Sequence, residues 1–349
     1  MMSRRTLCRR GLAWSAGVLL ASKAGTIVAA DTASRSAAGW QTALRDAADV
    51  ARRMKAAGGP RGWRVAVGLN GFMSSEQVHK KRYPIWEVLD FCQQEGFEGV
   101  ELVQGWPAGE YPAADDRRRV DALRGLYERY GLKIHTIQSA PTGRPFAESA
   151  AERAEWLRTF GEQVRLARAL GCDFVGTWPG GPLGEQTIDE AIDRCAATYR
   201  RAAQMCADEG MWLSFEIEPP FVFNTLDHLR RILAGADHPA CKTNYDPSHF
   251  DLMSDRSGRP ELMLKALGVE HVGHVHLTDT DGTLFGGTSR HVACGDGHCD
   301  IDASLKTLWD GGYRGWIMID AWMIEDVYDA CRKGKRAVEG MGARRAKSE

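Results

Sequence analysis

Short apolar runs alternate with longer segments of helical period along most of the chain. The apolar runs are rich in β-branched and aromatic residues, and they begin near Val65, Gly99, Lys133, Asp173, Trp212, Lys242, His271 and Trp316. Their mean spacing is about 36 residues, close to the length of one βα unit, which is roughly 30 residues or more. The pattern therefore predicts eight strands separated by helices.

Helical periods fill the intervals, most clearly over 84–95, 150–170, 188–208 and 225–234, and glycines follow or precede them at Gly96, Gly131, Gly171 and Gly210. Alternating strands and helices favour a parallel sheet, and eight units favour a closed (β/α)8 barrel in a single domain, which we expect to span 64–341. The first apolar run is not followed by GxGxxG, and the chain has no GxxxxGK[ST] loop, so the main signs of a dinucleotide or nucleotide fold are missing.

The N-terminal segment has a different pattern. Residues 1–30 carry arginines that include the pair Arg4-Arg5, then a short apolar run, then the small residues Val28-Ala29-Ala30. This order is typical of an export signal, here of the twin-arginine type, and the apolar run is short for the roughly 20 residues that a membrane span needs. We expect a periplasmic or secreted protein without a stable span in the mature chain. Residues 31–63 are expected to form a linker and a docking helix, and 342–349 a tail.

Composition excludes some partners. The 349 residues are 44% hydrophobic and 26% charged, with a net charge of -1, so no bulk field favours nucleic acid or anionic lipid. The nine cysteines form no CxxC pair, although Cys294 and Cys299 could bond in an oxidising compartment. The sequence leaves a homo-oligomer open.

Reactive side chains end four of the predicted strands, where barrel enzymes place their active sites. The fifth run ends in Glu216 and Glu218, the sixth in Asp246 and His249, the seventh in His274 and His276, and the eighth in Asp320. Carboxylates that converge in one barrel mouth cannot all stay ionised without a cation. Mixed oxygen and nitrogen ligands suit one divalent ion, Mn, Mg, Co or Zn, rather than a structural thiolate zinc.

Strand periodicity limits the choice of ligands. Side chains at i and i+2 share a face, so Glu216 and Glu218 are expected to point the same way, as are His274 and His276. One residue of each pair is the expected ligand, and the other is expected to contact the ligand or the substrate.

At these residues the sequence resembles the xylose-isomerase-like barrel superfamily, the sugar phosphate isomerase/epimerase group. The resemblance runs from about residue 65 to 341. It is carried by Glu-Ile-Glu-Pro with Asn224-Thr225, by Asn-Tyr-Asp-Pro-Ser-His, by His-Val-His-Leu-Thr-Asp, and by the loop 295–302. By this resemblance the metal ligands are Glu216, Asp246, His276 and Asp320. Glu216 is preferred over Glu218 because its distances from Gly210 and Asn224 match the usual spacing.

The resemblance also implies a chemistry. The metal would polarise a keto sugar, and a carboxylate would take the proton next to its carbonyl, giving an enediolate. The catalytic candidates are Glu216, Glu218, Asp320 and His249, the last resembling the family's substrate-contacting histidine. Asp320 departs from the family, whose sugar epimerases have Glu there, and its shorter reach weakens the case for two-base epimerisation. We therefore expect an isomerase or epimerase, or alternatively a lyase that eliminates a β-substituent from a keto-glycoside or inosose.

Substrate class follows from the expected location. Sugar phosphates are scarce outside the cytoplasm, so an unphosphorylated carbohydrate is expected. Its candidate contacts are His249, His274, Trp178, Arg290 and His291, with Trp106 and Trp322 as further rings that could stack on a sugar. Glu101, His135 and Gln138 could line the pocket, without assigned roles. Two other classes are disfavoured: a metal-dependent abasic-site endonuclease needs a basic face, and a non-catalytic binding protein does not need intact ligands on four strands.

Overall fold

The computed structural model describes residues 49, 52–53, 62–255 and 259–346. Eight parallel strands close into a barrel in the order β1-β10-β7-β6-β5-β4-β3-β2. They are β1 (Arg64–Gly68), β2 (Gly99–Val103), β3 (Lys133–Ser139), β4 (Phe174–Thr177), β5 (Trp212–Phe215), β6 (Cys241–Tyr245), β7 (Val272–Leu277) and β10 (Trp316–Ile319). The predicted (β/α)8 barrel is confirmed, with each strand starting within one residue of the expected position. The expected export signal and most of the expected linker and docking helix lie outside the described residues.

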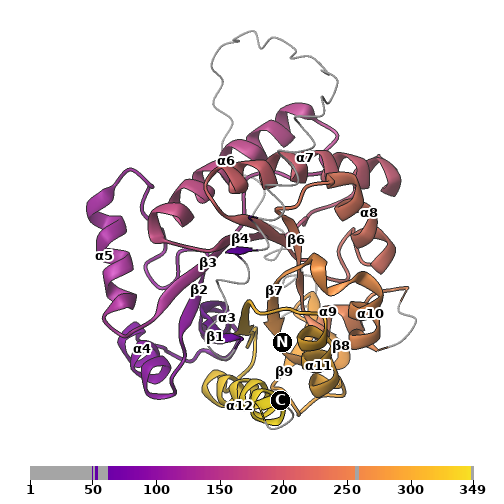
Figure 1. Ribbon diagram of the computed structural model, residues 1–349. Coiled ribbons are helices and arrows are strands. Elements are labelled where there is room, and N and C mark those ends of the chain that lie inside the picture. The colour runs from indigo at the N-terminus through magenta and orange to yellow at the C-terminus, as the bar shows by residue number, and fades with distance from the viewer. Residues whose placement is uncertain (1–48, 50–51, 54–61, 256–258, 347–349) are drawn as a thin grey trace, which may run out of the picture. The chain divides into compact units, whose positions relative to one another are not determined.

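Helices surround the ring of strands (Figure 1). They are α3 (Leu69–His79), α4 (Ile85–Gln94), α5 (Arg117–Glu128), α6 (Ala150–Leu170), α7 (Ile188–Asp208), α8 (Leu226–Ala236), α9 (Pro247–Asp251), α10 (Pro260–Leu267), η1 (Val269–His271), α11 (Ile301–Asp310) and α12 (Val327–Ala346). Local signals set their ends. Thr187 and Glu190 form a reciprocal capping box at the start of α7, and Gly171 ends α6 with φ 79°. Within the described ranges, no helix is both long and apolar enough to cross a membrane.

Rings fill the barrel interior, so it is a packed core rather than a pore. Phe174 stacks on Trp212 with centroids 5.2 Å apart, and His135 stacks on Trp316 at 4.6 Å. Phe174 also contacts His274 at 4.6 Å. Burial lowers the pKa of His135 well below its usual value and also lowers that of His274, so both rings pack as neutral groups.

Two irregularities in strand register lie beside polar residues of the interior. Between β2 and β3 the register shifts at Val100 and Glu101, and between β6 and β7 it shifts at Thr243 and Asn244. A bulge re-aims the side chains next to it. Gly273, the extra residue on β7, permits this close packing, because a Cβ there would lie 2.5 Å from that of Lys242.

A two-stranded hairpin follows β7 outside the barrel order. Its strands are β8 (Asp279–Phe285) and β9 (Thr288–Val292), joined by Gly286 and Gly287, which both have positive φ. The sequence predicted only a loop here. The described cysteines, Cys92 to Cys331, are all free, so Cys294 and Cys299 form no disulfide in this structure.

Candidate metal centre at the barrel mouth

Five buried residues direct one polar atom each toward a common region at the carboxyl ends of the strands. We call them the five-residue cluster: Glu216 directly after β5, Asp246 directly after β6, His276 on β7, His291 on β9 and Asp320 directly after β10. They are between 1% and 7% exposed. Four ligands predicted from sequence are therefore neighbours, and the hairpin adds His291, for which the sequence predicted substrate contact.

The distances within the five-residue cluster suit a bound cation. His276 Nδ1 lies 2.9 Å from Glu216 Oε1 and 3.7 Å from Asp320 Oδ2. His291 Nε2 lies 3.5 Å from Asp246 Oδ2 and 3.8 Å from Asp320 Oδ2. Ligand atoms that surround one ion at about 2.0–2.2 Å have separations of this order.

Each carboxylate of the cluster uses one oxygen for the protein and leaves the other facing the cluster. Trp178 Nε1 donates to Glu216 Oε2 at 3.0 Å. Asp320 Oδ1 accepts from Asn70 Nδ2 and from the backbone of Trp322, both at 2.9 Å. The third carboxylate is held locally, because Asp246 caps α9 through Oδ1, which accepts from the backbone and hydroxyl of Ser248.

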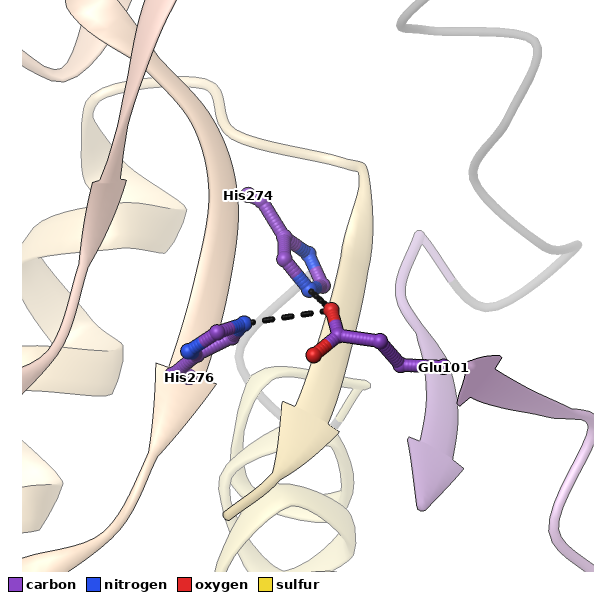
Figure 2. Close-up of side chains that lie close together, drawn as sticks. All are labelled: Glu101, His274 and His276. Carbon is purple, nitrogen blue, oxygen red and sulfur yellow. Dashed lines mark hydrogen bonds and ion pairs between the residues drawn. The ribbon is translucent and has the colours of Figure 1, made fainter. Parts of the chain in front are cut away.

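The imidazoles of the cluster are arranged like its carboxylates, with one nitrogen bonded to the protein and the other facing the cluster. His276 Nε2 donates to Glu101 Oε2 at 3.2 Å, and His274 Nε2 donates to the same oxygen at 3.1 Å (Figure 2). A carboxylate only accepts, so His276 is protonated at Nε2 and its Nδ1 faces the cluster. Figure 2 shows Glu101 reaching across from β2 to the two histidines of β7. Sequence analysis gave Glu101 no role, and here it sets the orientation of a ligand.

The atoms that face the cluster lack other partners. Glu216 Oε1, Asp246 Oδ2, His276 Nδ1 and His291 Nε2 are all buried without a hydrogen bond. Buried polar atoms are normally paired, so these four atoms are satisfied either by protons on the imidazoles or by a bound cation. The ligand atoms of Glu216, Asp246 and His276 lie within 4.8 Å of one another, as do those of Asp246, His249 and His291. Oxygen and nitrogen donors of this kind fit a divalent ion such as Zn, Mn or Co.

The pKa values of the cluster are shifted: burial raises that of Asp320, those of the two imidazoles are also raised, and that of Asp246 is lowered. Burial lowers the pKa of His276 and of His291, but nearby carboxylates outweigh it, raising the pKa of His276 well above its usual value and that of His291 to about 9. Burial raises the pKa of Asp246, but the nearby imidazoles of His249 and His291 outweigh it and hold this pKa well below its usual range. Without a cation, protons on the imidazoles balance the carboxylates.

His249 lies beside the five-residue cluster at the end of a directed hydrogen-bond chain. Its Nε2 is 4.0 Å from Glu216 Oε1 and 3.9 Å from Asp246 Oδ2. Ser248 donates its hydroxyl to Asp246, so Ser289, 2.8 Å from Ser248, must donate to Ser248 and accept from His249 Nδ1, also at 2.8 Å. This order places the Nδ1 proton of His249 toward Ser289 and leaves its Nε2 facing the cluster.

The remaining predicted site residues have different surroundings. Burial raises the pKa of Glu218, which is partly exposed and close enough to His249 and Glu216 to feel their charges. His274 is fully buried against Glu101. Arg290 is exposed and pairs with Asp281 at 2.9 Å, because alternation along β9 turns it away from Ser289 and His291. Substrate contact stays a prediction for all of them.

Two features of the site, the β8–β9 hairpin and Asn70, were not predicted from the sequence. The hairpin had a usable signal, since Gly286-Gly287 between β-rich segments favours a tight turn. Asn70 had none, because its contact with Asp320 spans 250 residues of sequence.

Known proteins share this architecture. The family model of the xylose isomerase-like TIM barrel matches residues 89–345. An inosose dehydratase from Clostridium botulinum is 22% identical over 247 residues, covering 65% of this chain and 78% of its own. The L-ribulose-5-phosphate 3-epimerase UlaE from Salmonella typhi is 22% identical over 278 residues, covering 78% and 95%.

Solved structures agree on the fold. The IOLI protein with a bound zinc atom has a TM-score of 0.66 at 16% identity, covering 80% of this chain and 98% of its own. The 3-keto-D-glucoside 4-epimerase YcjR from E. coli has a TM-score of 0.60 at 15% identity, covering 80% and 99%. The relatives match the expected enzyme class, sugar isomerase or epimerase with a lyase as the alternative. With its closed barrel and a matching model over most of its length, the chain belongs to the xylose isomerase-like TIM barrel family.

Proposed function

We propose that this protein is a divalent-metal-dependent isomerase or epimerase of an unphosphorylated sugar or keto sugar, exported to the periplasm or beyond. The observation that carries the proposal is the five-residue cluster, in which buried, unpartnered atoms of three carboxylates and two imidazoles converge. A bound divalent ion would act there as a Lewis acid toward a carbonyl and an adjacent hydroxyl of the substrate.

The chain's own residues supply the proton transfer. His249 donates from Nδ1 in the chain of hydrogen bonds described above, so its Nε2 is the atom that lies beside the cluster, where a substrate carbon or hydroxyl would come. Burial raises the pKa of Glu218, which favours its protonated form and suits it to return a proton to the substrate. One group that accepts a proton and one that returns it are the parts that moving a proton next to a carbonyl requires.

An unphosphorylated substrate is consistent with the pairing of three cationic side chains, one after β3, one on β9 and one on α12. Arg144 after β3 pairs with Glu152 at 2.9 Å, Arg290 pairs with Asp281, and Lys333 pairs with Asp296 at 2.7 Å. Each of these cations already has an acidic partner. The predicted export signal, at residues 1–30, supports the same substrate class.

A lyase is the second candidate, and Asp320 favours it. Both its oxygens are engaged, Oδ1 with Asn70 and Trp322 and Oδ2 toward the cluster, and its side chain is one methylene shorter than Glu. A carboxylate so held reaches a substrate C–H less easily, which weakens epimerisation by two opposed bases. Loss of a β-substituent needs only one base and one acid.

The test is elemental analysis followed by solvent exchange. Purified protein is expected to hold near one equivalent of divalent metal, Asp246→Ala to lose it, and Asp189→Ala, an exposed acid on α7, to keep it. With unphosphorylated keto sugars and 3-keto-glycosides in deuterated water, an isomerase gives deuterated isomers and a lyase gives an unsaturated product.

Two outcomes would contradict the proposal. Absence of metal in the wild type after Mn, Co or Zn is supplied would remove the mechanism. Sugar binding with metal present but no exchange at any carbon would leave a binding protein.

A further inference from the structure

We infer that His291, from the β8–β9 hairpin, is a ligand of the metal and compensates for the short side chain of Asp320. The inference rests on the metal of the proposed function and adds to it a second nitrogen ligand that comes from outside the eight barrel strands.

The tautomer of His291 is fixed by its own backbone. Its Nδ1 lies 3.0 Å from the carbonyl oxygen of Ser289, which can only accept, so Nδ1 carries the proton. In the neutral ring, the form that binds a metal, Nε2 is then the nitrogen with the lone pair, and it is buried without another hydrogen-bond partner. This lone pair faces the carboxylate oxygens of Asp246, at 3.5 Å, and Asp320, at 3.8 Å. Three lone-pair atoms facing one another are favourable when a cation lies between them.

The hairpin is fixed well enough to present a ligand. Ser289, two residues before His291, bonds to Ser248 and His249 of α9, and Thr278 Oγ1 donates to the carbonyl of Val292 at 3.2 Å. Alternation on β9 buries Ser289 and His291 together and exposes Arg290. The ring is therefore supported on both sides along the strand, as metal-binding imidazoles usually are.

The short side chain of Asp320 explains why a second nitrogen ligand, Nε2 of His291, would be useful. Asn70 and the Trp322 backbone hold Oδ1, so only Oδ2 is available, on a side chain one methylene shorter than Glu. An imidazole that approaches from the hairpin side, 3.8 Å from that oxygen, adds a donor atom next to the shortened ligand. His249 is the rival nitrogen, because its Nε2 lies 3.9 Å from Asp246 Oδ2, and the test must separate the two.

X-ray absorption spectroscopy of the zinc-loaded full chain tests the inference without a substrate. We expect two imidazole ligands in the wild type and in Arg290→Ala, the exposed neighbour, and one in His291→Gln. His291→Gln is also expected to lower zinc affinity by at least tenfold in competition with a chelator. Circular dichroism of each variant in chelator checks that the comparison is between folded proteins.

The outcomes separate the inference from the function it rests on. Zinc bound by the wild type with one imidazole, or with two that persist in His291→Gln, would overturn the role of His291 and keep the metal. A wild type that binds no zinc would overturn both. Loss of one imidazole in His249→Gln but not in His291→Gln would transfer the ligand role to His249.

Discussion

At the scale of single residues, the site is built by dividing each side chain between two tasks. One polar atom of Glu216, Asp246, His276, His291 and Asp320 is held by a hydrogen bond, and the other is left for a ligand. The holding groups are donors or acceptors of fixed kind, such as an indole N–H or a carbonyl oxygen. The ligand atoms are therefore oriented before any ion binds.

Glu101 is the most informative of these holding groups. We expect Glu101→Gln to weaken zinc binding by about 10- to 100-fold, because the neutral amide loses the charge that holds His276 in its Nε2–H form. Chelator competition measures the change. Glu98→Gln, a partly exposed acid near the start of the same strand, is the control, and equal affinities for the two variants would contradict the assignment.

The affinity for metal should increase with pH. The pKa values of His276 and His291 lie above their usual value, the latter at about 9, so both rings are charged at neutral pH without metal. Because a metal binds only the unprotonated ring, apparent zinc affinity should rise from pH 6 to pH 9. Isothermal titration in buffers of different ionisation enthalpy would also detect the released protons. An affinity that is flat over this range would show that no proton is displaced.

Sequence reasoning identified the ligand strands but not the holding groups, and the reason is physical. Asp246, His276 and Asp320 each follow or end an apolar run, and the ends of parallel strands meet at one edge. Glu101 interrupts the apolar run GVELV, which marks it as unusual, yet its partners are 173 and 175 residues away. Pairing over such distances leaves no periodic signal in a single sequence.

At the scale of elements, the hairpin connects the barrel mouth to α9. We expect Ser289→Ala to lower the free energy of unfolding by about 1–3 kcal/mol, because Ser248 and His249 lose a buried partner. Denaturant unfolding of the metal-free protein measures this. Ser254→Ala, at an exposed serine, should change stability by no more than about 0.5 kcal/mol. If the two variants had equal free energies of unfolding, the stability of the hairpin would not depend on the contacts of Ser289.

The elements were more predictable than their irregularities. Strand starts followed from apolar runs after turn residues, and long helices from their period and capping residues, so β and α segments agreed with expectation. The hairpin lacks a sustained apolar alternation, since Leu284 and Phe285 at its tip are exposed, and it was therefore interpreted as a loop. The bulges at Glu101 and Asn244 depend on packing between strands, which periodicity does not report.

At the scale of the whole molecule, metal and fold should be coupled. An ion that binds only the native state adds about 2.7 kcal/mol of stability at a concentration 100 times its Kd. We expect zinc to raise the thermal midpoint of the wild type and chelator to reverse the change. Asp246→Asn, which keeps the shape of the side chain, should show no zinc effect. A midpoint independent of metal in the wild type would mean that the five-residue cluster is not a binding site.

The position of His291 has a consequence for how such barrels diversify. Four members of the five-residue cluster come from barrel strands or the residues directly after them, whose positions the closed sheet fixes, whereas His291 belongs to a surface hairpin of residues 279–292. A hairpin can be lengthened, shortened or replaced without breaking the ring of strands. If His291 binds the metal as proposed, one part of the coordination sphere is fixed by the closed sheet and another is carried by a replaceable hairpin, so a change in the hairpin alone would alter the set of ligands.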